Sequence, residues 1–330
     1  MAPARTPRVV HIVSHGPHCL DGVAAAVAIA RYYDGVDVRP RFSGNPDINR
    51  TILDLEFEGP LADQELWITD ISWTAPEADR FLRERAAAGL SIYWIDHHRT
   101  AIERLARGSI DVPFTHRIVD DRFAAARLTY DYLTERLERD RVINADFAGF
   151  APVVAMADDN DRWIHAIPGS WELALTLRSL NSPEAFDELR HVDEGVHYTP
   201  KLRVAHEKVE AELAKSFALA ERTRSERSLA SGVRVIAAVC DGYPSEIADR
   251  WGKVTPNAVF ALFDLQGGAV SYRRSPDCAV DLSRVAETFG GGGHPAAAGS
   301  EIPELLHELA RGTGERVAAA VEKQRDQKPA

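Results

Sequence analysis

The chain is poor in cysteine, in long apolar runs and in positive charge, and each shortage excludes a class of protein. Its three cysteines, Cys19, Cys240 and Cys278, are odd in number and widely spaced, so no disulfide framework is predicted. The apolar runs are short, such as residues 23–30, and fall well below the length of a membrane span. The first eight residues lack the apolar core of a secretory signal. We therefore expect a cytoplasmic protein with no membrane partner.

The shortage of positive charge bears on the ligand. Lysine and arginine total 39 against 50 aspartates and glutamates, which gives a formal net charge of −11. A protein that neutralises many phosphates normally has a basic surface, so no long nucleic-acid duplex is expected. A short anionic substrate, held by bound metal and a few arginines, is compatible with this acidity.

The length and the pattern of the chain predict more than one domain. With 330 residues, of which 45% are hydrophobic, the chain can bury the cores of two domains. The first half alternates short apolar strands with helices of ten or more residues, which predicts βαβ units and a mostly parallel sheet. The strands are expected at residues 9–14, 36–42, 66–70, 90–95 and 114–119, and the helices at 22–33, 76–88 and 123–139.

The pattern changes after Trp163. Residues 170–227 have apolar positions at helical spacing. Strands are then expected at 233–239, 258–265 and 269–273, with a hairpin turn at 266–268 and helices at 245–251 and 281–289. The prediction is an α/β protein: a parallel-sheet N-terminal domain with flanking helices (1–180), a helical connector (181–228) and a smaller α+β C-terminal domain (229–330).

Three residues of types that can bind metal or phosphate follow the predicted strand 90–95. Asp96, His97 and His98 are consecutive, and neighbouring side chains on a regular strand point to opposite faces. They can share one site only where the strand ends, and ligands of open α/β sheets bind at the carboxyl ends of the strands. The alternative is a surface loop that carries two histidines.

Other strand and helix ends carry similar residues. The exit of the first strand contains His15, His18, Cys19 and Asp21, all plausible ligands of a transition metal, although Asp21 could instead cap the following helix. Asp70 closes the third strand. An apolar helix, residues 150–157, is followed by Asp158, Asp159 and Asp161, where the helix dipole disfavours carboxylates.

Each of these groups has an ordinary alternative, since Asp70 could be a turn residue and the acidic run a solvated loop. Together they place histidine and aspartate at the carboxyl ends of successive strands. Two cations a few ångströms apart in such a setting activate water and neutralise a phosphoryl group. The pattern therefore predicts a two-metal hydrolase.

The order of these motifs resembles the DHH phosphoesterase superfamily, which includes nano-RNases, RecJ-like exonucleases and cyclic-dinucleotide phosphodiesterases. The resemblance covers nearly the whole chain. Residues 289–299 are similar to the glycine-rich motif of the DHH-associated, substrate-binding domain. Consecutive glycines let a backbone approach a phosphate and offer it N–H groups, which a flexible low-complexity loop would not require.

The resemblance implies a role for each motif residue. One metal would be held by His15, Cys19 and Asp70, and the other by Asp21, Asp70 as a bridge, His97 and an acid of the run. Asp161 is favoured as that acid, because Asp161-Arg162-Trp163 resembles the Asp-x-Trp of some members, and Asp159 is the alternative. His98 would contact the scissile phosphate and Asp96 would support the site. In the second domain, a substrate phosphate would be bound by Arg273 or Arg274, together with Gly292, Gly293 and His294.

One position departs from the family pattern. The family usually has aspartate where this chain has Cys19, and a thiolate is a softer ligand that favours Zn²⁺ or Fe²⁺ over Mn²⁺ or Mg²⁺. Two alternatives stay open: Cys19 packs in the turn as a small apolar residue, or His18 takes its place as a ligand.

The resemblance thus implies two divalent metal ions, with Mn²⁺ expected first and Mg²⁺, Zn²⁺ or Fe²⁺ as alternatives. We expect a hydrolase that cleaves phosphodiester bonds of short oligonucleotides or dinucleotides in a cleft between the domains. An exopolyphosphatase, a small-nucleotide phosphatase and a non-catalytic nucleotide sensor are the alternatives. A homodimer is left open.

Overall fold

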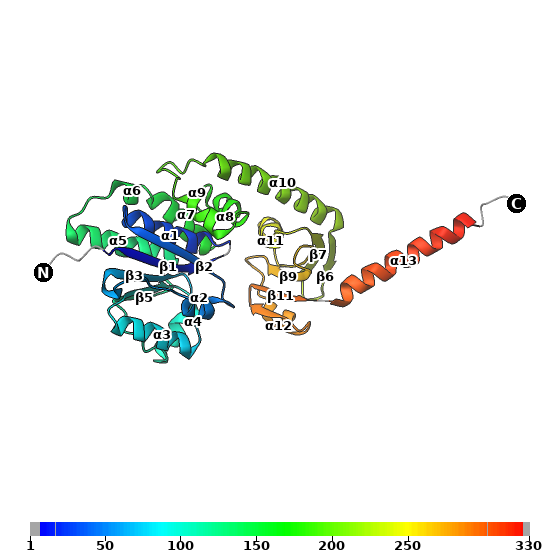
Figure 1. The fold of residues 1–330 in the computed structure, drawn as a ribbon. Helices are drawn as coiled ribbons and strands as arrows, with labels where there is room; N and C mark the ends of the chain where they lie inside the picture. The colour runs from blue at the N-terminus through cyan, green and yellow to red at the C-terminus, as the bar shows by residue number, and fades with distance from the viewer. Residues whose placement is uncertain (1–6, 17, 302, 326–330) are drawn as a thin grey trace. The chain divides into compact units, whose positions relative to one another are not determined.

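The computed structural model describes residues 7–16, 18–301 and 303–325 (Figure 1). The chain divides into two compact units, residues 1–209 and 210–330, and each unit is described by itself. The division falls within helix α10 (Pro200–Thr223), inside the predicted connector. The predicted boundaries at residues 180 and 228 stay predictions.

A five-stranded parallel sheet forms the centre of the first unit. Its strands are β1 (Val9–His15), β2 (Asp37–Ser43), β3 (Gln64–Thr69), β4 (Ser91–Asp96) and β5 (His116–Val119), in the order β2-β1-β3-β4-β5. The order reverses between β1 and β3, and such a switch point opens a crevice at the carboxyl ends of the strands. The parallel sheet predicted from the sequence is confirmed.

Helices cover both faces of this sheet (Figure 1). They are α1 (Leu20–Tyr32), α2 (Ile48–Leu53), α3 (Pro76–Ala87), α4 (Arg99–Ala106), α5 (Ala125–Asp140), α6 (Ala145–Ala148), α7 (Ala151–Asp161), α8 (Ser170–Arg178) and α9 (Ser182–Leu189), with a 3₁₀ turn at Leu61–Asp63. Side chains alternate between two cores, so that Trp67 packs on the side of α1 and α5 while Ile68 packs on the side of α2 and α3. The central strands β1, β3 and β4 are largely apolar because both of their faces are buried.

Helix α1 lies unusually close to the end of β1. A Cβ atom at Gly22 would lie only 2.4 Å from the carbonyl oxygen of His15, so only glycine fits there. The hydroxyl of Ser14 donates a hydrogen bond to the Gly22 carbonyl at 2.7 Å. This contact fixes the first turn of α1 beside the carboxyl end of β1.

Most boundaries differ from the sequence-based expectation by a few residues, and two of the differences, in α7 and α10, change the interpretation. Helix α7 continues to Asp161, so the acidic residues form its last turn rather than a loop beyond it. Asp158 is compensated there, because it accepts the backbone N–H of Ala124 at 2.8 Å and pairs with Arg162. The helix expected to reach residue 227 ends at Thr223, because β6 (Ser225–Ser228) pairs with β7 (Arg234–Cys240).

The second unit is built on a six-stranded mixed sheet. Its strands are β6, β7 (Arg234–Cys240), β8 (Ala258–Asp264), β9 (Ala269–Arg274), β10 (Gly292–His294) and β11 (Ala297–Glu301), in the order β10-β11-β9-β8-β7-β6. Only β7 and β8 are parallel. The helices are α11 (Pro244–Gly252), α12 (Leu282–Glu287) and α13 (Pro303–Arg325). The predicted smaller α+β domain is confirmed as a fold.

The glycine-rich segment forms a hairpin rather than an open loop. β10 and β11 pair in antiparallel register, with Gly293 opposite Ala298. Gly293 has a φ of 142°, and a Cβ atom there would lie 2.6 Å from the Ala298 Cα. Glycine is therefore required at this position for backbone packing, apart from any contact with a phosphate. Among the helices that the structure describes, none is long and apolar enough to cross a membrane.

Candidate metal centre

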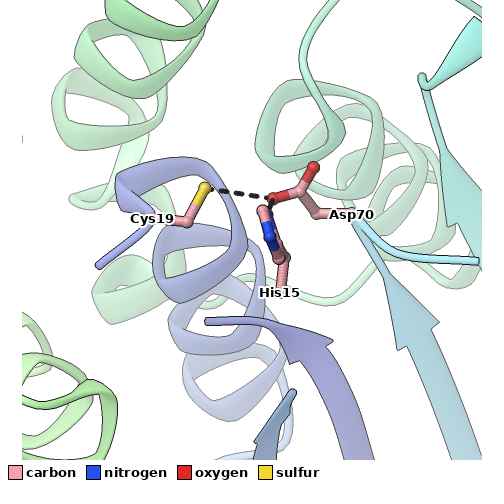
Figure 2. A group of neighbouring side chains, drawn as sticks. All are labelled: His15, Cys19 and Asp70. Atoms are coloured by element: carbon pink, nitrogen blue, oxygen red, sulfur yellow. Dashed lines mark hydrogen bonds and ion pairs between the residues drawn. The ribbon is translucent and has the colours of Figure 1, made fainter. Parts of the chain in front are cut away.

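Asp70 lies at the centre of the residues gathered at the carboxyl edge of the first sheet. One of its oxygens, Oδ2, lies 3.3 Å from the Cys19 Sγ and 3.4 Å from His15 Nδ1 (Figure 2). Its other oxygen, Oδ1, lies 3.2 Å from His97 Nε2. The two oxygens of one buried carboxylate thus face two different groups of potential ligands, as a bridging ligand must.

The backbone of Asp70 is held in an uncommon conformation. Its φ is 57°, in the left-handed region that side-chain-bearing residues seldom occupy. The Asp70 N–H donates to the carbonyl oxygen of Ile95 at 3.0 Å, so the chain turns sharply at the end of β3 while still tied to β4. Strained residues of this kind cluster at functional sites.

A second group of ligand types surrounds His97. The His97 Nε2 atom lies 3.6 Å from an oxygen of Asp21 and 3.6 Å from an oxygen of Asp161. Asp21 is fully buried on α1, whereas the Asp161 side chain, on the last turn of α7, is 27% exposed. His97 directly follows β4, and the two aspartates come from α1 and α7, so the three residues are distant in sequence.

His98 is held by a buried aspartate. Its Nδ1 atom lies 2.7 Å from Asp96 Oδ1, which also accepts the backbone N–H groups of His97 and His98. The hydroxyl of Ser72 donates to the other Asp96 oxygen. The hydrogen bond to Asp96 raises the pKa of His98 to about 9. The His98 side chain is 40% exposed, so a protonated imidazole is presented to solvent.

The carboxylates of the centre repel one another. Burial first, and then the charges of Asp70 and Asp161, raise the pKa of Asp21 well above its usual value. Burial also raises the pKa of Asp161. Burial alone would raise the pKa of Asp70 as well, but hydrogen bonds from His15 and His97 lower it below its usual range. The centre therefore concentrates negative charge that a cation would relieve.

Asp21 is fixed by a neighbouring helix. Its two oxygens accept the backbone N–H groups of Ala125 and Ala126, at 2.9 and 2.7 Å, in the first turn of α5. Those N–H groups have no partner within their own helix, and the positive end of the helix dipole favours a carboxylate. Asp21 thus satisfies α5 and does not cap its own helix, which begins at Leu20 with no side-chain cap.

The donor set fits divalent cations. Three sets of residues each bring their potential ligand atoms within 4.8 Å of one another. They are His15 with Cys19 and Asp70, Asp70 with His97 and His98, and Asp21 with His97 and Asp161. Imidazole, carboxylate and thiolate are ordinary ligands of transition metals. Asp70 belongs to two of the sets and His97 to two, which suits a pair of neighbouring ions.

Cys19, and not His18, lies with the candidate ligands. His18 is exposed and, within the described part of the chain, belongs to none of the three sets. Burial, Asp70 and Asp21 together raise the pKa of the Cys19 thiol well above its usual value. Without a cation, Cys19 is therefore a neutral thiol that donates to Asp70.

Asp159 lies in the same turn of α7 but has a different environment. It is buried, and its oxygens accept the hydroxyl of Ser170 at 2.5 Å and the backbone N–H groups of Ala166 and Ile167. These contacts fix the loop that follows α7. Asp159 is absent from the three candidate ligand sets, whereas Asp161 is in one of them.

The sequence assigned no role to two residues beside the centre, Ser72 and Trp163, although Trp163 belongs to the Asp161-Arg162-Trp163 resemblance. Ser72 supports Asp96, and only the burial of Asp96 could have suggested that it needs such a donor. Trp163 follows Asp161 by two residues and is 50% exposed, with its ring 4.5 Å from that of His165. Both Trp163 and His165 have positive φ, and an exposed tryptophan after an acidic run was the available signal.

The phosphate-binding residues expected in the C-terminal domain lie in the second unit. Arg273 donates to the Tyr272 carbonyl and to the Ser245 hydroxyl, and Arg274 donates to the Val280 carbonyl. Burial lowers the pKa of Arg273. Gly292, Gly293 and His294 are exposed on the edge strand β10. These contacts use only part of the donors that a guanidinium offers.

Comparisons with known proteins agree with the fold and the motifs. No family model matches the chain. The chain is 26% identical over 323 residues to oligoribonuclease NrnB of Bacillus subtilis, covering 91% of this chain and 74% of the relative.

Several solved structures share the fold, among them a phosphodiesterase and a RecJ protein. The first is the pGpG-specific phosphodiesterase PggH of Vibrio cholerae, with a TM-score of 0.56, 12% identity and coverage of 94% and 99% of the two chains. The second is RecJ of Thermus thermophilus in complex with Mn²⁺, with a TM-score of 0.54, 16% identity and coverage of 94% of this chain and 52% of RecJ.

The Asp96-His97-His98 motif closes the fourth strand of a sheet that these structures share, and a relative matches most of the chain. The order of motifs read from the sequence leads to the same assignment. Together the relative, the shared fold and the order of motifs support an assignment to the DHH phosphoesterase superfamily.

Proposed function

We propose that the chain is a metal-dependent phosphodiesterase that hydrolyses short oligonucleotides or dinucleotides. The observation that carries this proposal is the Asp70 carboxylate, whose two oxygens face two sets of ligand types within 4.8 Å. The curated relative is an oligoribonuclease and one structural neighbour is a pGpG-specific phosphodiesterase. Both activities support a short nucleotide substrate, and the net negative charge of the chain disfavours a long nucleic acid.

The proposed ligands fall into two groups. His15, Cys19 and Asp70 would hold one cation, and Asp21, Asp70, His97 and Asp161 would hold the other. When bound, divalent cations in such a pair activate water and neutralise phosphoryl charge. The RecJ neighbour contains Mn²⁺, which supports manganese as the first metal to test, and the Cys19 thiol keeps Zn²⁺ and Fe²⁺ as alternatives.

His98 supplies positive charge from the protein itself. Because Asp96 accepts from Nδ1, the opposite ring nitrogen, Nε2, is free to donate to a phosphate oxygen. The raised pKa keeps His98 protonated at neutral pH in the metal-free protein. A donor fixed in this way stabilises the charge that develops on phosphorus-bound oxygens. Asp96 acts as a positioning residue.

Trp163 favours a substrate that carries a nucleobase. Consecutive Cα atoms are about 3.8 Å apart, so the Cα of Trp163 lies within about 7.6 Å of the Cα of Asp161. Its exposed ring is a stacking surface of the kind that binds single-stranded bases. The loop that carries it is fixed by Asp159. A site for inorganic polyphosphate would have no use for such a ring.

We retain the second-unit residues as substrate ligands in the proposal. Arg273 or Arg274 would bind a substrate phosphate with the donors that its protein contacts leave free. The exposed His294 and the neighbouring glycines, Gly292 and Gly293, would approach the same phosphate.

The test is a substrate screen with the purified full chain and its metal content measured. Dinucleotides, cyclic dinucleotides, polyphosphate and 3′-phosphoadenosine nucleotides are each incubated with Mn²⁺, and the products are separated. We expect two equivalents of metal and the fastest cleavage with dinucleotides. Cleavage of polyphosphate alone would replace the proposed substrate class. A chain that binds no metal and cleaves nothing would instead be a nucleotide sensor.

A further inference from the structure

One face of the sheet in the second unit is only partly covered. On β7, Ile236, Ala238 and Cys240 are buried in a core that includes residues of α10 and α11, while Ala237 and Val239 between them point to the opposite face and are exposed or half-buried. Helix α12 covers that opposite face near β8 and β9. The uncovered remainder is a groove of about 630 Å³ lined almost wholly by apolar side chains, among them Val235, Val239 and Phe289.

Helix α13 has an apolar side that packs against no other part of the described chain. It has 23 residues, and every described residue from His307 to Gln324 is exposed except Gly312. Leu309, Val317 and Val321 are 62%, 56% and 54% exposed, and their spacing of four and eight residues places them on one side of the helix. Arg311 and Glu315 form an ion pair on the other side.

An amphipathic helix whose apolar side is exposed lacks the packing that would stabilise it. Isolated helices gain little stability in water, and most helical stability comes from packing an amphipathic face. The groove and the exposed face of α13 are both apolar, and both belong to the same chain. Leu305, in the first turn of α13, lines the groove, so the helix begins at the surface that it matches.

The same copy of the helix does not fill the groove. At about 1.5 Å per residue, Val321 lies about 24 Å along the axis from Leu305. Because α13 is continuous from Pro303 to Arg325, Leu305 lies at the groove while the remaining apolar positions extend beyond it into solvent. Those positions are available to a groove on another molecule.

We propose that α13 packs into the apolar groove of a second copy of this chain, so that two chains exchange their C-terminal helices. The exchange is reciprocal, since each copy has this groove and its own α13, and it closes as a two-fold dimer. The proposal concerns assembly and does not depend on the activity proposed above.

The experiment measures the mass of the full chain by sedimentation velocity across a range of protein concentrations. The wild type is expected to sediment at twice the chain mass of 36.4 kDa. Leu309→Glu and Val317→Glu should raise the dimer dissociation constant at least roughly a hundredfold, because a charge would be buried without a partner. Ala319→Glu is the matched control on the polar side of the same helix and should leave the dimer intact.

A groove variant separates the proposed contact from simple pairing of two α13 helices. Ala237 lines the groove and is exposed in the single chain, so Ala237→Glu should leave the monomer folded and abolish the dimer. If the α13 variants dissociate and Ala237→Glu does not, α13 pairs with another α13 and the groove proposal is overturned. A wild type that is monomeric at all concentrations, or variants that stay dimeric, would overturn it as well.

Discussion

Asp70 Oδ1 lies 3.2 Å from His97 Nε2, while Asp70 Oδ2 lies 3.3 Å from the Cys19 sulfur. One carboxylate thus joins the end of β3 to residues from β4 and from the start of α1. Its conformation is part of the arrangement, because a φ of 57° directs the side chain from the strand end into the group of ligands. The first prediction follows from this position.

Replacing Asp70 should remove metal binding and activity together. Asp70→Asn is the suitable change, because asparagine tolerates the left-handed conformation and the fold should survive. We expect metal affinity and the hydrolysis rate to fall by more than about a hundredfold, beyond what the loss of a group behind the ligands causes. Metal titration by calorimetry and circular dichroism test this. A rate within a few-fold of wild type would sink the shared-ligand assignment.

Asp161 and Asp159 should respond in opposite ways to the same change. Asp161→Asn should weaken metal binding by more than about tenfold without destabilising the metal-free protein, since it removes a charge that Asp21 and Asp70 repel. Asp159→Asn should leave metal binding unchanged and cost about 1–3 kcal/mol of stability. Its buried oxygens accept three hydrogen bonds, which an amide group disrupts. Reversed outcomes would exchange the two roles.

The sequence predicted the parallel sheet and the strand ends that carry Asp70 and His97, because apolar runs and their boundaries are local signals. It favoured Asp161 over Asp159 only through the resemblance of Asp161-Arg162-Trp163 to a family motif, with no physical ground for the choice. That distinction depends on Ser170 and on the backbone of residues 166 and 167, which reach Asp159 only after the loop has folded. The partner of Asp21 is likewise more than a hundred residues away, so a helix cap was the natural local alternative.

Cys19 provides a test of metal preference. Cys19→Asp should restore the ligand usual in the family and shift activity from softer ions toward Mn²⁺ and Mg²⁺. In the metal-free protein the raised pKa of the thiol means that binding a cation must displace its proton. Rates with Mn²⁺, Mg²⁺, Co²⁺ and Zn²⁺ are compared for both proteins, with bound metal quantified. An active variant with an unchanged profile would show that the thiolate is no ligand.

Trp163 should matter for the base and not for the phosphate. Trp163→Ala is expected to lower kcat/KM for a dinucleotide at least about fivefold, the smaller end of a stacking contribution, mainly through KM. For an abasic dinucleotide, Trp163→Ala should leave kcat/KM unchanged. Trp163→Phe should retain most of the kcat/KM for the ordinary dinucleotide. Wild-type protein must first cleave the dinucleotide, which tests the function separately. Equal losses on both substrates would indicate a structural role for the ring.

The His98–Asp96 pair should make the stability of the metal-free protein depend on pH. Its hydrogen bond raises the pKa of His98 to about 9 in the folded chain, against about 6.5 when unfolded. Protonation therefore favours the folded state. The gain is full below pH 6.5 or so and is lost as the pH rises through about 9. Urea unfolding of wild type and His98→Gln should differ at pH 6 and converge at pH 10, and His191→Gln serves as a control. If the unfolding free energies of wild type and His98→Gln differed equally at pH 6 and pH 10, the stabilising role of the protonated His98–Asp96 pair would be contradicted.

The two hydrogen bonds from α5 to Asp21 have a consequence for the choice of ion. A carboxylate anchored at both oxygens cannot swing to follow ions of different radius, so the ion must suit the ligand. Ca²⁺ prefers long bonds and adaptable ligands, whereas Mg²⁺ and ions of its size need short bonds in fixed directions. A centre whose deepest acid is fastened to the backbone in this way is expected to discriminate against large cations by rigidity, even though its charge would attract them equally.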